Sequence, residues 1–168
     1  MNHLYLCGFM GCGKSTVGKQ LAKGLGTRFL DLDDYIVEKA GKSIPEIFAS
    51  QGEEAFRDWE TKCLSELSQK PRMVIATGGG TLMRPQNVQA AKESGKIVFL
   101  DIPFAECYRR IKGDENRPVA ARSTPEELEA LNNTRREVYS SVCDLSVEQV
   151  LSPMETSDLI IQRVKSLG

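Results

Sequence analysis

A glycine-rich segment near the N-terminus has the spacing of a phosphate-binding loop. Residues 8–15 read GFMGCGKS and match the pattern G-x-x-x-x-G-K-[ST]. Glycines allow phosphate oxygens to approach backbone N–H groups, and a helix that begins at the loop directs its positive end toward the anion. Lys14 can then bridge the β- and γ-phosphates while the Ser15 hydroxyl binds Mg²⁺. The segment predicts a site for a nucleoside triphosphate with Mg²⁺; the alternative is a chance glycine-rich turn.

Carboxylates follow the short strand expected at residues 28–32. Alternation along that strand would place Asp31 and Asp33 on the same side. An acid near the loop can hold Mg²⁺ through water, and a second acid can accept a hydrogen bond from a substrate hydroxyl. Acids also favour the start of a helix, which is the alternative explanation and the only role expected for Asp34.

A second glycine segment, Thr77–Gly80, follows the apolar strand expected at residues 73–76. P-loop proteins often carry a metal-facing acid at the end of such a later strand. No acid stands here, so Asp31 is the candidate for that position. Three consecutive glycines could form a plain flexible turn, but they would also let a ligand approach bare backbone N–H groups.

Several arginines could hold anions: Arg57, Arg117, Arg135 and Arg136. Glu60 comes three residues after Arg57 on a predicted helix, close enough to orient the guanidinium. An oriented guanidinium is suited to bidentate capture of a carboxylate or phosphate. A single surface arginine usually faces solvent, however, so spacing alone does not assign these residues.

The elements that must position these side chains alternate between strand and helix. Strands are expected at 4–7, 28–32, 73–76, 96–100 and 144–147. Helices are expected at 14–25, from Ser43 with Glu46 at capping-box distance, and at 53–68, 84–93, 103–111, 125–142 and 155–167. This alternation predicts an α/β fold with a mostly parallel sheet and helices on both faces. Ligands of such sheets bind beyond the carboxyl ends of the strands, where the candidate residues occur.

Composition excludes several classes of function. A net charge of −1 over 168 residues leaves no chain-wide basic footprint for nucleic acid. Five cysteines without a C-x-x-C pair, and a single histidine, argue against a zinc site, a disulfide framework and Ser-His or Cys-His catalysis. No apolar run is long enough to span a membrane, and the apolar N-terminus leads directly into the glycine loop. We therefore expect a cytoplasmic protein without membrane or nucleic-acid partners.

Taken together, the motifs resemble the shikimate kinase family, a relative of the nucleoside monophosphate kinases. They occur in this order: Gly8-x-x-Gly11-x-Gly13-Lys14-Ser15-Thr16, Asp31-x-Asp33, Gly52-Glu53-x-x-Phe56-Arg57, Thr77-Gly78-Gly79-Gly80, Arg117-Pro118 and Arg135-x-x-x-Tyr139. The resemblance covers nearly the whole chain. It implies a single kinase domain over residues 1–168 with a P-loop kinase fold and a five-stranded parallel sheet of order 2-3-1-4-5. A substrate-binding region at about 32–60 and a mobile lid at about 112–124 are also implied.

The resemblance also implies a reaction: ATP phosphorylates the 3-hydroxyl of shikimate in the presence of Mg²⁺. The implied catalytic residues are Asp33, Lys14 and Arg117, and the implied substrate-binding residues are Asp33, Arg57, Gly79 and Arg135. ATP would be bound by Gly11, Cys12, Gly13, Lys14, Ser15, Thr16, Arg110 and Arg117. Mg²⁺ would be held by Ser15 and, through water, by Asp31. The family expectation is a monomer.

Two other functions compete with this interpretation. One is another small-molecule kinase, acting for example on gluconate or a nucleotide, although the Asp-x-Asp, triple-glycine and Arg57 set argues against it. The other is a non-catalytic NTP-binding switch, which would hydrolyse nucleotide slowly without a small acceptor. Within the proposed site, Arg136 competes with its neighbour Arg135 for contact with a substrate carboxylate.

Overall fold

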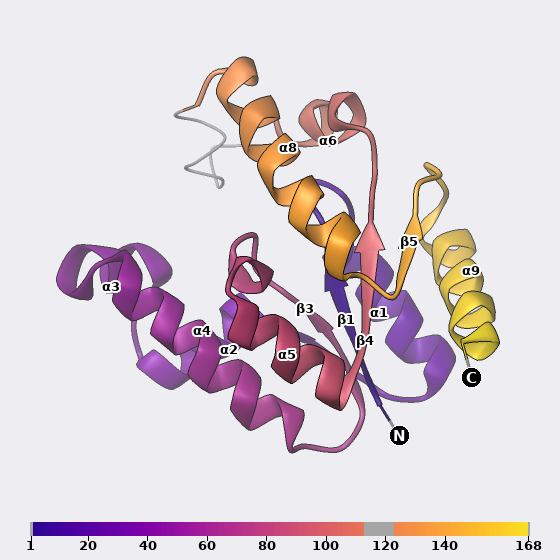
Figure 1. Cartoon of the computed structure of the whole chain (residues 1–168), viewed down its shortest axis with the longest axis horizontal. Helices are drawn as coiled ribbons and strands as arrows, with labels where there is room; N and C mark the ends of the chain where they lie inside the picture. The colour runs from indigo at the N-terminus through magenta and orange to yellow at the C-terminus, as the bar shows by residue number, and fades with distance from the viewer. Residues whose placement is uncertain (1, 113–122, 168) are drawn as a thin grey trace.

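Five short strands form one parallel sheet in a computed structural model of the chain, which describes residues 2–112 and 123–167 (Figure 1). The strands are β1 His3–Cys7, β2 Arg28–Asp31, β3 Met73–Ala76, β4 Gly95–Leu100 and β5 Leu145–Val147. Their order is β2-β3-β1-β4-β5, and each neighbouring pair is parallel. The predicted sheet order is therefore confirmed, and the carboxyl ends of β2, β3 and β1 lie side by side.

Helices cover both faces of the sheet because successive strand residues point to opposite sides. The helices are α1 Lys14–Leu25, α2 Leu32–Ala40, α3 Ile44–Gln51, α4 Glu53–Ser68, α5 Pro85–Ser94, α6 Phe104–Ile111, α8 Pro125–Val142 and α9 Pro153–Ser166, with a 3₁₀ turn η1 at Thr81–Met83. Leu4 and Leu6 of β1 pack in one core with residues of α1 and α9. Tyr5 and Cys7 pack in a second core with residues of α4 and α5.

Helix ends follow local capping chemistry, which explains why several boundaries were predictable. Gly26 ends α1 in the left-handed conformation, with φ 64°. Reciprocal capping boxes begin α3 at Ser43, α8 at Thr124 and α9 at Ser152. The predicted ranges 14–25, 53–68 and 125–142 coincide with α1, α4 and α8.

Several predicted boundaries differ by one or two residues, such as the start of α9 at Pro153 rather than 155. The prediction for residues 28–34 was wrong in kind. Strand β2 ends at Asp31 rather than Leu32, and α2 begins at the next residue. Asp31 is the N-cap, because its Oδ1 accepts a hydrogen bond from the backbone N–H of Asp34 at 3.2 Å. The capping role assigned to Asp34 therefore belongs to Asp31. Asp33 lies in the first helical turn, so strand alternation does not relate it to Asp31.

Two further findings concern the chain as a whole. The lid expected at 112–124 falls mainly on residues 113–122, which lie outside the described residues, and Arg117 is among them. None of the helices that the structure describes is both long and apolar enough to cross a bilayer.

Candidate functional site

The segments that follow β1, β2 and β3 meet at one edge of the sheet, as the parallel order requires. They are the glycine loop after β1, the acids after β2 and the glycine turn Thr77–Gly80 after β3. A Cβ placed on Gly78 would lie 2.8 Å from Asp33 Oδ1, so the acids lie against the glycine turn. The predicted convergence of these three motifs is thus found in the structure.

The glycine loop presents its backbone and the N-terminus of α1 to this edge. Gly11 and Gly13 have φ values of 82° and 97°, which strongly favour glycine. Gly13 is the N-cap of α1 and supplies no side-chain acceptor for the first N–H groups of the helix. The Lys14 ammonium group donates to the Gly8 carbonyl at 2.6 Å. The loop therefore combines open backbone donors, a helix dipole and one cation, as an anion site requires.

Three further residues predicted to bind ATP lie within this loop or directly after it. Ser15 and Thr16 are exposed in the first turn of α1. Cys12 is buried, with its sulfur 3.9 Å from the Lys14 nitrogen. Its side chain belongs to the hydrophobic core, so only the backbone of Cys12 is available to a bound anion.

Arg110 approaches the loop from α6. Its Nη1 donates to the Gly11 carbonyl at 2.9 Å, and its Nε donates to Glu106 at 3.0 Å. Hydrogen bonding from Arg109, together with the charges of Arg109 and Arg110, lowers the pKa of Glu106 to about 2. Glu106 therefore stays ionised and fixes Arg110 beside the phosphate-binding loop.

Asp33 provides an unpaired acceptor at the centre of the site. Its Oδ1 is buried and has no hydrogen-bond partner among the described residues. Burial, followed by the charges of Asp31 and Glu60, raises the pKa of Asp33 to about 6, while Lys14 acts in the opposite direction. A buried carboxylate oxygen without a donor is costly, so its position indicates a ligand group that donates to it.

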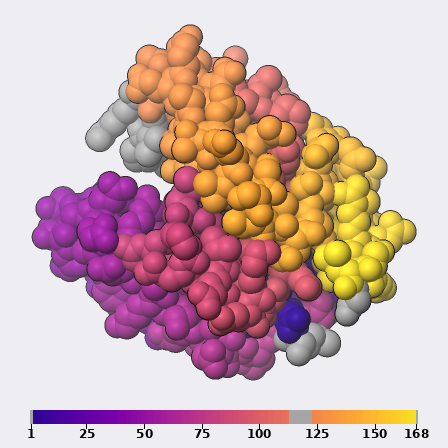
Figure 2. All heavy atoms as spheres, in the orientation of Figure 1, coloured from indigo at the N-terminus to yellow at the C-terminus, as the bar shows by residue number. Residues whose placement is uncertain are grey.

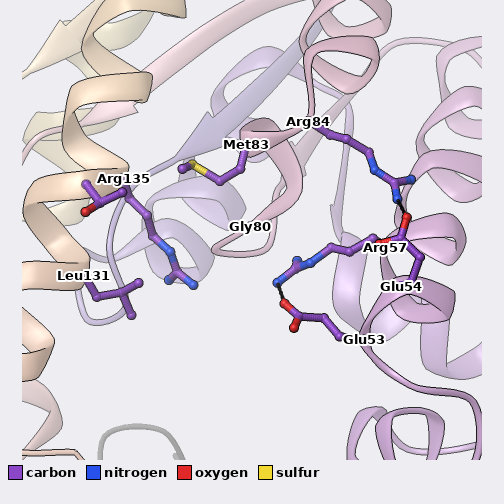
Figure 3. Close-up of a pocket in the computed structure, with 9 residues that line it drawn as sticks. Glu53, Glu54, Arg57, Gly80, Met83, Arg84, Leu131 and Arg135 are labelled. Atoms are coloured by element: carbon purple, nitrogen blue, oxygen red, sulfur yellow. Dashed lines mark hydrogen bonds and ion pairs between the residues drawn. The ribbon is translucent and has the colours of Figure 1, made fainter.

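A pocket of about 390 Å³ opens between α4, α8 and the turn that follows β3. Arg57 from α4 and Arg135 from α8 extend into it from opposite sides, with Gly80 between them (Figure 3). Met83 and Leu131 add apolar surface. In the space-filling view the molecule is hollowed between purple α3 and orange α8 (Figure 2). The pocket thus joins cationic walls to a partly apolar lining.

Arg57 is held by a buried hydrogen-bond network. Its Nη1 donates to Glu60 Oε1 at 2.7 Å, and Glu60 is only 1% exposed. The other oxygen of Glu60 accepts from the Thr81 hydroxyl at 2.5 Å, and that hydroxyl accepts from the Gly78 N–H at 3.1 Å. The predicted orienting role of Glu60 is matched by this geometry, which also links Arg57 to the glycine turn.

Arg135, not Arg136, faces the pocket. Arg135 makes no ion pair with another described residue, and burial, with the charge of Arg57, lowers its pKa. Arg136 does not line the pocket and instead donates to both carboxylate oxygens of Asp101, at 2.8 and 2.9 Å. Two converging guanidinium groups, one lacking an acidic partner, make the pocket suitable for an anion.

The two guanidinium groups pack directly against the backbone of the glycine turn. A Cβ on Gly79 would overlap the guanidinium of Arg135, and a Cβ on Gly80 would overlap that of Arg57. Gly79 and Gly80 therefore have a steric function that was not predicted from the sequence: they leave room for the two arginines, while Gly78 leaves room for Asp33.

A third arginine at the pocket is neutralised. Arg84 follows η1 and pairs with Glu54 at 2.7 Å and Asp58 at 3.0 Å, both on α4. These ion pairs fix the start of α5 against α4. Arg84 was not among the predicted residues, and neither were Leu131 and Met83. Leu131 precedes Arg135 by one helical turn, and that spacing could have revealed it.

The oxygen groups at this edge do not form a preformed metal cage. No cluster of three or more His, Cys, Asp or Glu side chains suited to a metal occurs within residues 2–112 and 123–167. The available donors are the Ser15 hydroxyl and the Asp31 carboxylate. Hard cations such as Mg²⁺ are typically held by one or two protein oxygens together with phosphates and water.

Comparisons with known proteins agree on one family. The family model described as "SKI: Shikimate kinase" matches residues 10–165. A shikimate kinase of Synechococcus elongatus is 41% identical over 98% of this chain and 87% of its own length. One of Geobacter sulfurreducens is 44% identical over 92% of this chain and 89% of its own. The solved shikimate kinase of Acinetobacter baumannii in complex with shikimate has a TM-score of 0.92 and 36% identity, over 99% of this chain and 94% of that one.

Proposed function

Because the chain belongs to the shikimate kinase family, we infer that it transfers the terminal phosphoryl group of ATP to the 3-hydroxyl of shikimate. One observation carries the assignment of the acceptor site. Arg57 and Arg135 converge on the pocket, while the Oδ1 of Asp33, which has no partner among residues 2–112 and 123–167, lies beside the adjoining glycine turn. Shikimate is an acid that carries ring hydroxyls, so it offers an anion to the arginines and a donor to Asp33.

In this proposal, Arg57, Gly79 and Arg135 bind shikimate, and the two arginines hold its carboxylate. Two fixed guanidinium groups define the orientation of the ring because each can donate two parallel hydrogen bonds to a carboxylate. Asp33 accepts the hydrogen bond of the reacting hydroxyl and takes its proton as the new P–O bond forms. Phosphoryl transfer depends chiefly on alignment and charge neutralisation, so late proton transfer to a group with pKa about 6 is sufficient.

The donor side of the reaction rests on the glycine loop. Lys14 and the loop amides, from Gly11 to Thr16, would hold the β- and γ-phosphates, and Arg110 would bind the nucleotide beyond them. Lys14 has the mobility for this role because its side chain is unbranched and only its tip is bonded, to main-chain carbonyls. Arg117, which lies outside the described residues, would add positive charge as part of the proposed lid at 112–124.

Mg²⁺ would be held by Ser15 and, through water, by Asp31. The oxygen-only donor set fits a hard cation, and the Asp31 carboxylate is next to the rest of the acidic group. The ion, when bound, neutralises charge on the phosphates. Asp31 would also keep its N-cap bond, which uses only Oδ1 and leaves the second oxygen for water.

The family resemblance further leads us to propose one kinase domain over residues 1–168, a substrate-binding region at about 32–60 and a cytoplasmic monomer. The convergence of the loop, the acids and the pocket on one sheet supports the single domain. Size-exclusion chromatography with light scattering at working concentrations tests the monomer, and a dimer mass would contradict it.

A coupled ADP-release assay tests the function. We expect rapid ADP formation with ATP, Mg²⁺ and shikimate, and formation slower by about 100-fold or more without shikimate, because no positioned acceptor is then present. Gluconate and nucleoside monophosphates should not replace shikimate, and excess EDTA should stop the reaction. ADP release that is independent of shikimate would instead favour an NTP-binding switch.

A further inference from the structure

The hydroxyl of Tyr139 holds the middle of the glycine turn. Tyr139 lies in α8, is 1% exposed, and donates a hydrogen bond to the Gly79 carbonyl at 2.6 Å. Its ring packs against Phe99 of β4, with the ring centroids 5.3 Å apart. Burial raises the pKa of the phenol well above its ordinary value, so the group remains a neutral donor. A single side chain thus joins α8 to the turn after β3.

This bond selects one orientation of a peptide that could otherwise turn over. Glycine accepts both signs of φ, so a peptide between two glycines has little intrinsic preference for direction. In a trans peptide the carbonyl and the following N–H point in opposite directions. Holding the Gly79 carbonyl toward Tyr139 therefore directs the N–H of Gly80 the other way. Gly80 lines the pocket, whereas Tyr139 does not.

The same bond fixes the turn relative to Arg135. Arg135 precedes Tyr139 by one helical turn, so the two side chains lie on one face of α8. The Arg135 guanidinium lies over Gly79, close enough to exclude a Cβ there. Without the phenol, this guanidinium is a strong donor close to the freed Gly79 carbonyl. A Gly79 carbonyl that rotates toward Arg135 would accept hydrogen bonds from this guanidinium in competition with the ligand. Its oxygen would also face, and repel, the carboxylate of the ligand.

We propose that Tyr139 is a positioning residue for the acid substrate: its hydroxyl keeps the Gly79 carbonyl out of the pocket and leaves Arg135 and the Gly80 N–H free to bind the carboxylate. The proposal rests on the proposed function of this pocket, since it assumes that shikimate binds between Arg57 and Arg135. Tyr139 itself would touch neither substrate nor nucleotide.

The test is Tyr139→Phe, which removes the hydroxyl and keeps the ring. We expect the KM for shikimate and its calorimetric Kd to rise about tenfold, equivalent to about 1.4 kcal/mol. The KM for ATP should stay within about twofold of the wild-type value. The Kd of methyl shikimate, whose ester carries no negative charge, should change much less than that of shikimate, because the perturbed contacts are those of the carboxylate.

Tyr5→Phe is the matched control. Tyr5 is fully buried in the same core, and its hydroxyl is bonded to Ser94 Oγ at 2.5 Å, away from the pocket. Both variants lose one buried hydroxyl bond, so both should melt at a lower temperature, but only Tyr139→Phe should weaken shikimate binding. A Tyr139→Phe protein with a lowered melting temperature and a wild-type Kd for shikimate would reduce Tyr139 to a structural residue and overturn the proposal.

Binding and turnover separate this proposal from the proposed function. A wild-type protein that binds shikimate without phosphorylating it would contradict the kinase function, while the Kd ratio between wild type and Tyr139→Phe would still decide the role of Tyr139. A wild-type protein with no affinity for shikimate would overturn both.

Discussion

At the scale of single residues, the candidate site contains a carboxylate, Asp33, whose ionised form is destabilised by the fold. Asp33 has one oxygen without a donor in the described part of the chain, and its pKa is raised to about 6 by burial and by neighbouring acids. The folded protein therefore binds this proton more tightly than the unfolded chain, whose reference pKa is 3.8. Ionised Asp33 destabilises the fold fully above about pH 6, and this destabilisation disappears below about pH 3.8.

Asp33→Asn should therefore stabilise the protein while removing activity. At pH 8 we expect the free energy of unfolding to rise by about 1–3 kcal/mol, a range reduced because Asp33 is partly exposed. The gain should vanish near pH 4. The shikimate-dependent kcat should fall by about 10²- to 10⁴-fold, as for loss of a general base. Urea unfolding at both pH values and the coupled assay measure the two effects.

The neighbouring variant Asp34→Asn serves as the control, since Asp34 is exposed and its backbone, not its carboxylate, makes the capping bond. It should retain most activity. In the wild-type protein, kcat/KM should decline below about pH 6 as Asp33 is protonated. A wild-type kcat/KM that does not decline below about pH 6 would argue against Asp33 as the base. Substantial activity of Asp33→Asn would argue against it as well.

The two adjacent arginines of α8 provide a second residue-scale prediction. Arg135→Ala should raise the KM for shikimate by at least tenfold (about 1.5–3 kcal/mol for a hydrogen bond to a charged group) because the pocket loses a guanidinium. Arg136→Ala should leave that KM unchanged and reduce stability by about 0–1 kcal/mol, since it removes a surface pair with Asp101. Steady-state kinetics with both variants decide the assignment, and a reversed pattern would contradict it.

At the scale of secondary-structure elements, α8 is the decisive helix because it places Leu131 and Arg135 in the pocket and bonds the glycine turn through Tyr139. Its start is fixed by Thr124, whose hydroxyl accepts from the Glu127 N–H at 3.1 Å while Glu127 caps in return. Helix α8 therefore begins at a defined residue, Pro125, shortly after residues 113–122, which lie outside the described chain. This start fixes where Leu131, Arg135 and Tyr139 lie along the helix.

Thr124→Ala should lower the free energy of unfolding by about 1 kcal/mol, the usual value of an N-cap. For a chain of this length, that corresponds to a melting temperature lower by about 2–4 °C. Thr124→Ser keeps the acceptor and should restore most of the loss. Thermal unfolding followed by circular dichroism measures both variants, and equal melting temperatures for Thr124→Ala and the wild type would show that the cap is dispensable.

Much of this element structure was readable from the sequence because its signals are local. Gly26, Ser43 and the helix-forming run 53–68 fix ends by chemistry within a few residues. The prediction for the segment Asp31–Asp34 was wrong because an acidic, alternating stretch is compatible with both a strand end and a helix start. Only the capping bond of Asp31 decides between them, and that bond depends on where β2 stops pairing with β3.

The site was readable in part, for a related reason. Motif positions such as Lys14, Asp33 and Arg57 follow strands or loops whose placement the sheet determines. Arg135 and Arg136 could not be separated because neighbouring helix residues differ only in direction, and Asp101, which draws Arg136 away, lies 35 positions distant. The contact between Glu60 and Thr81 is also invisible locally, because it joins residues 21 positions apart.

At the scale of the whole molecule, the pocket is shared between elements that are far apart in sequence. Arg57 reaches it from α4 and Arg135 from α8, on opposite sides of the pocket (Figure 3). A ligand that binds both arginines would connect these two parts of the domain. Because such a ligand binds the folded state alone, its affinity adds to the stability of the entire cooperative unit.

Shikimate at about 100 times its Kd should therefore stabilise the protein by about 2.7 kcal/mol and raise the melting temperature by roughly 5–10 °C. Methyl shikimate at the same concentration should give a much smaller shift, because it offers no carboxylate to the arginines. Differential scanning fluorimetry measures both. Equal shifts for the acid and its ester would indicate that the ligand binds without engaging Arg57 and Arg135.

The bare backbone beneath the two guanidinium groups has a consequence for inhibitor resistance. A side chain at position 79 or 80 would displace the flexible tip of an arginine and leave the main chain in place. We expect such a variant to fold but to bind its substrate more weakly. An inhibitor pressed against this turn therefore faces a surface that mutation cannot reshape without disabling the enzyme, which makes the turn a durable target.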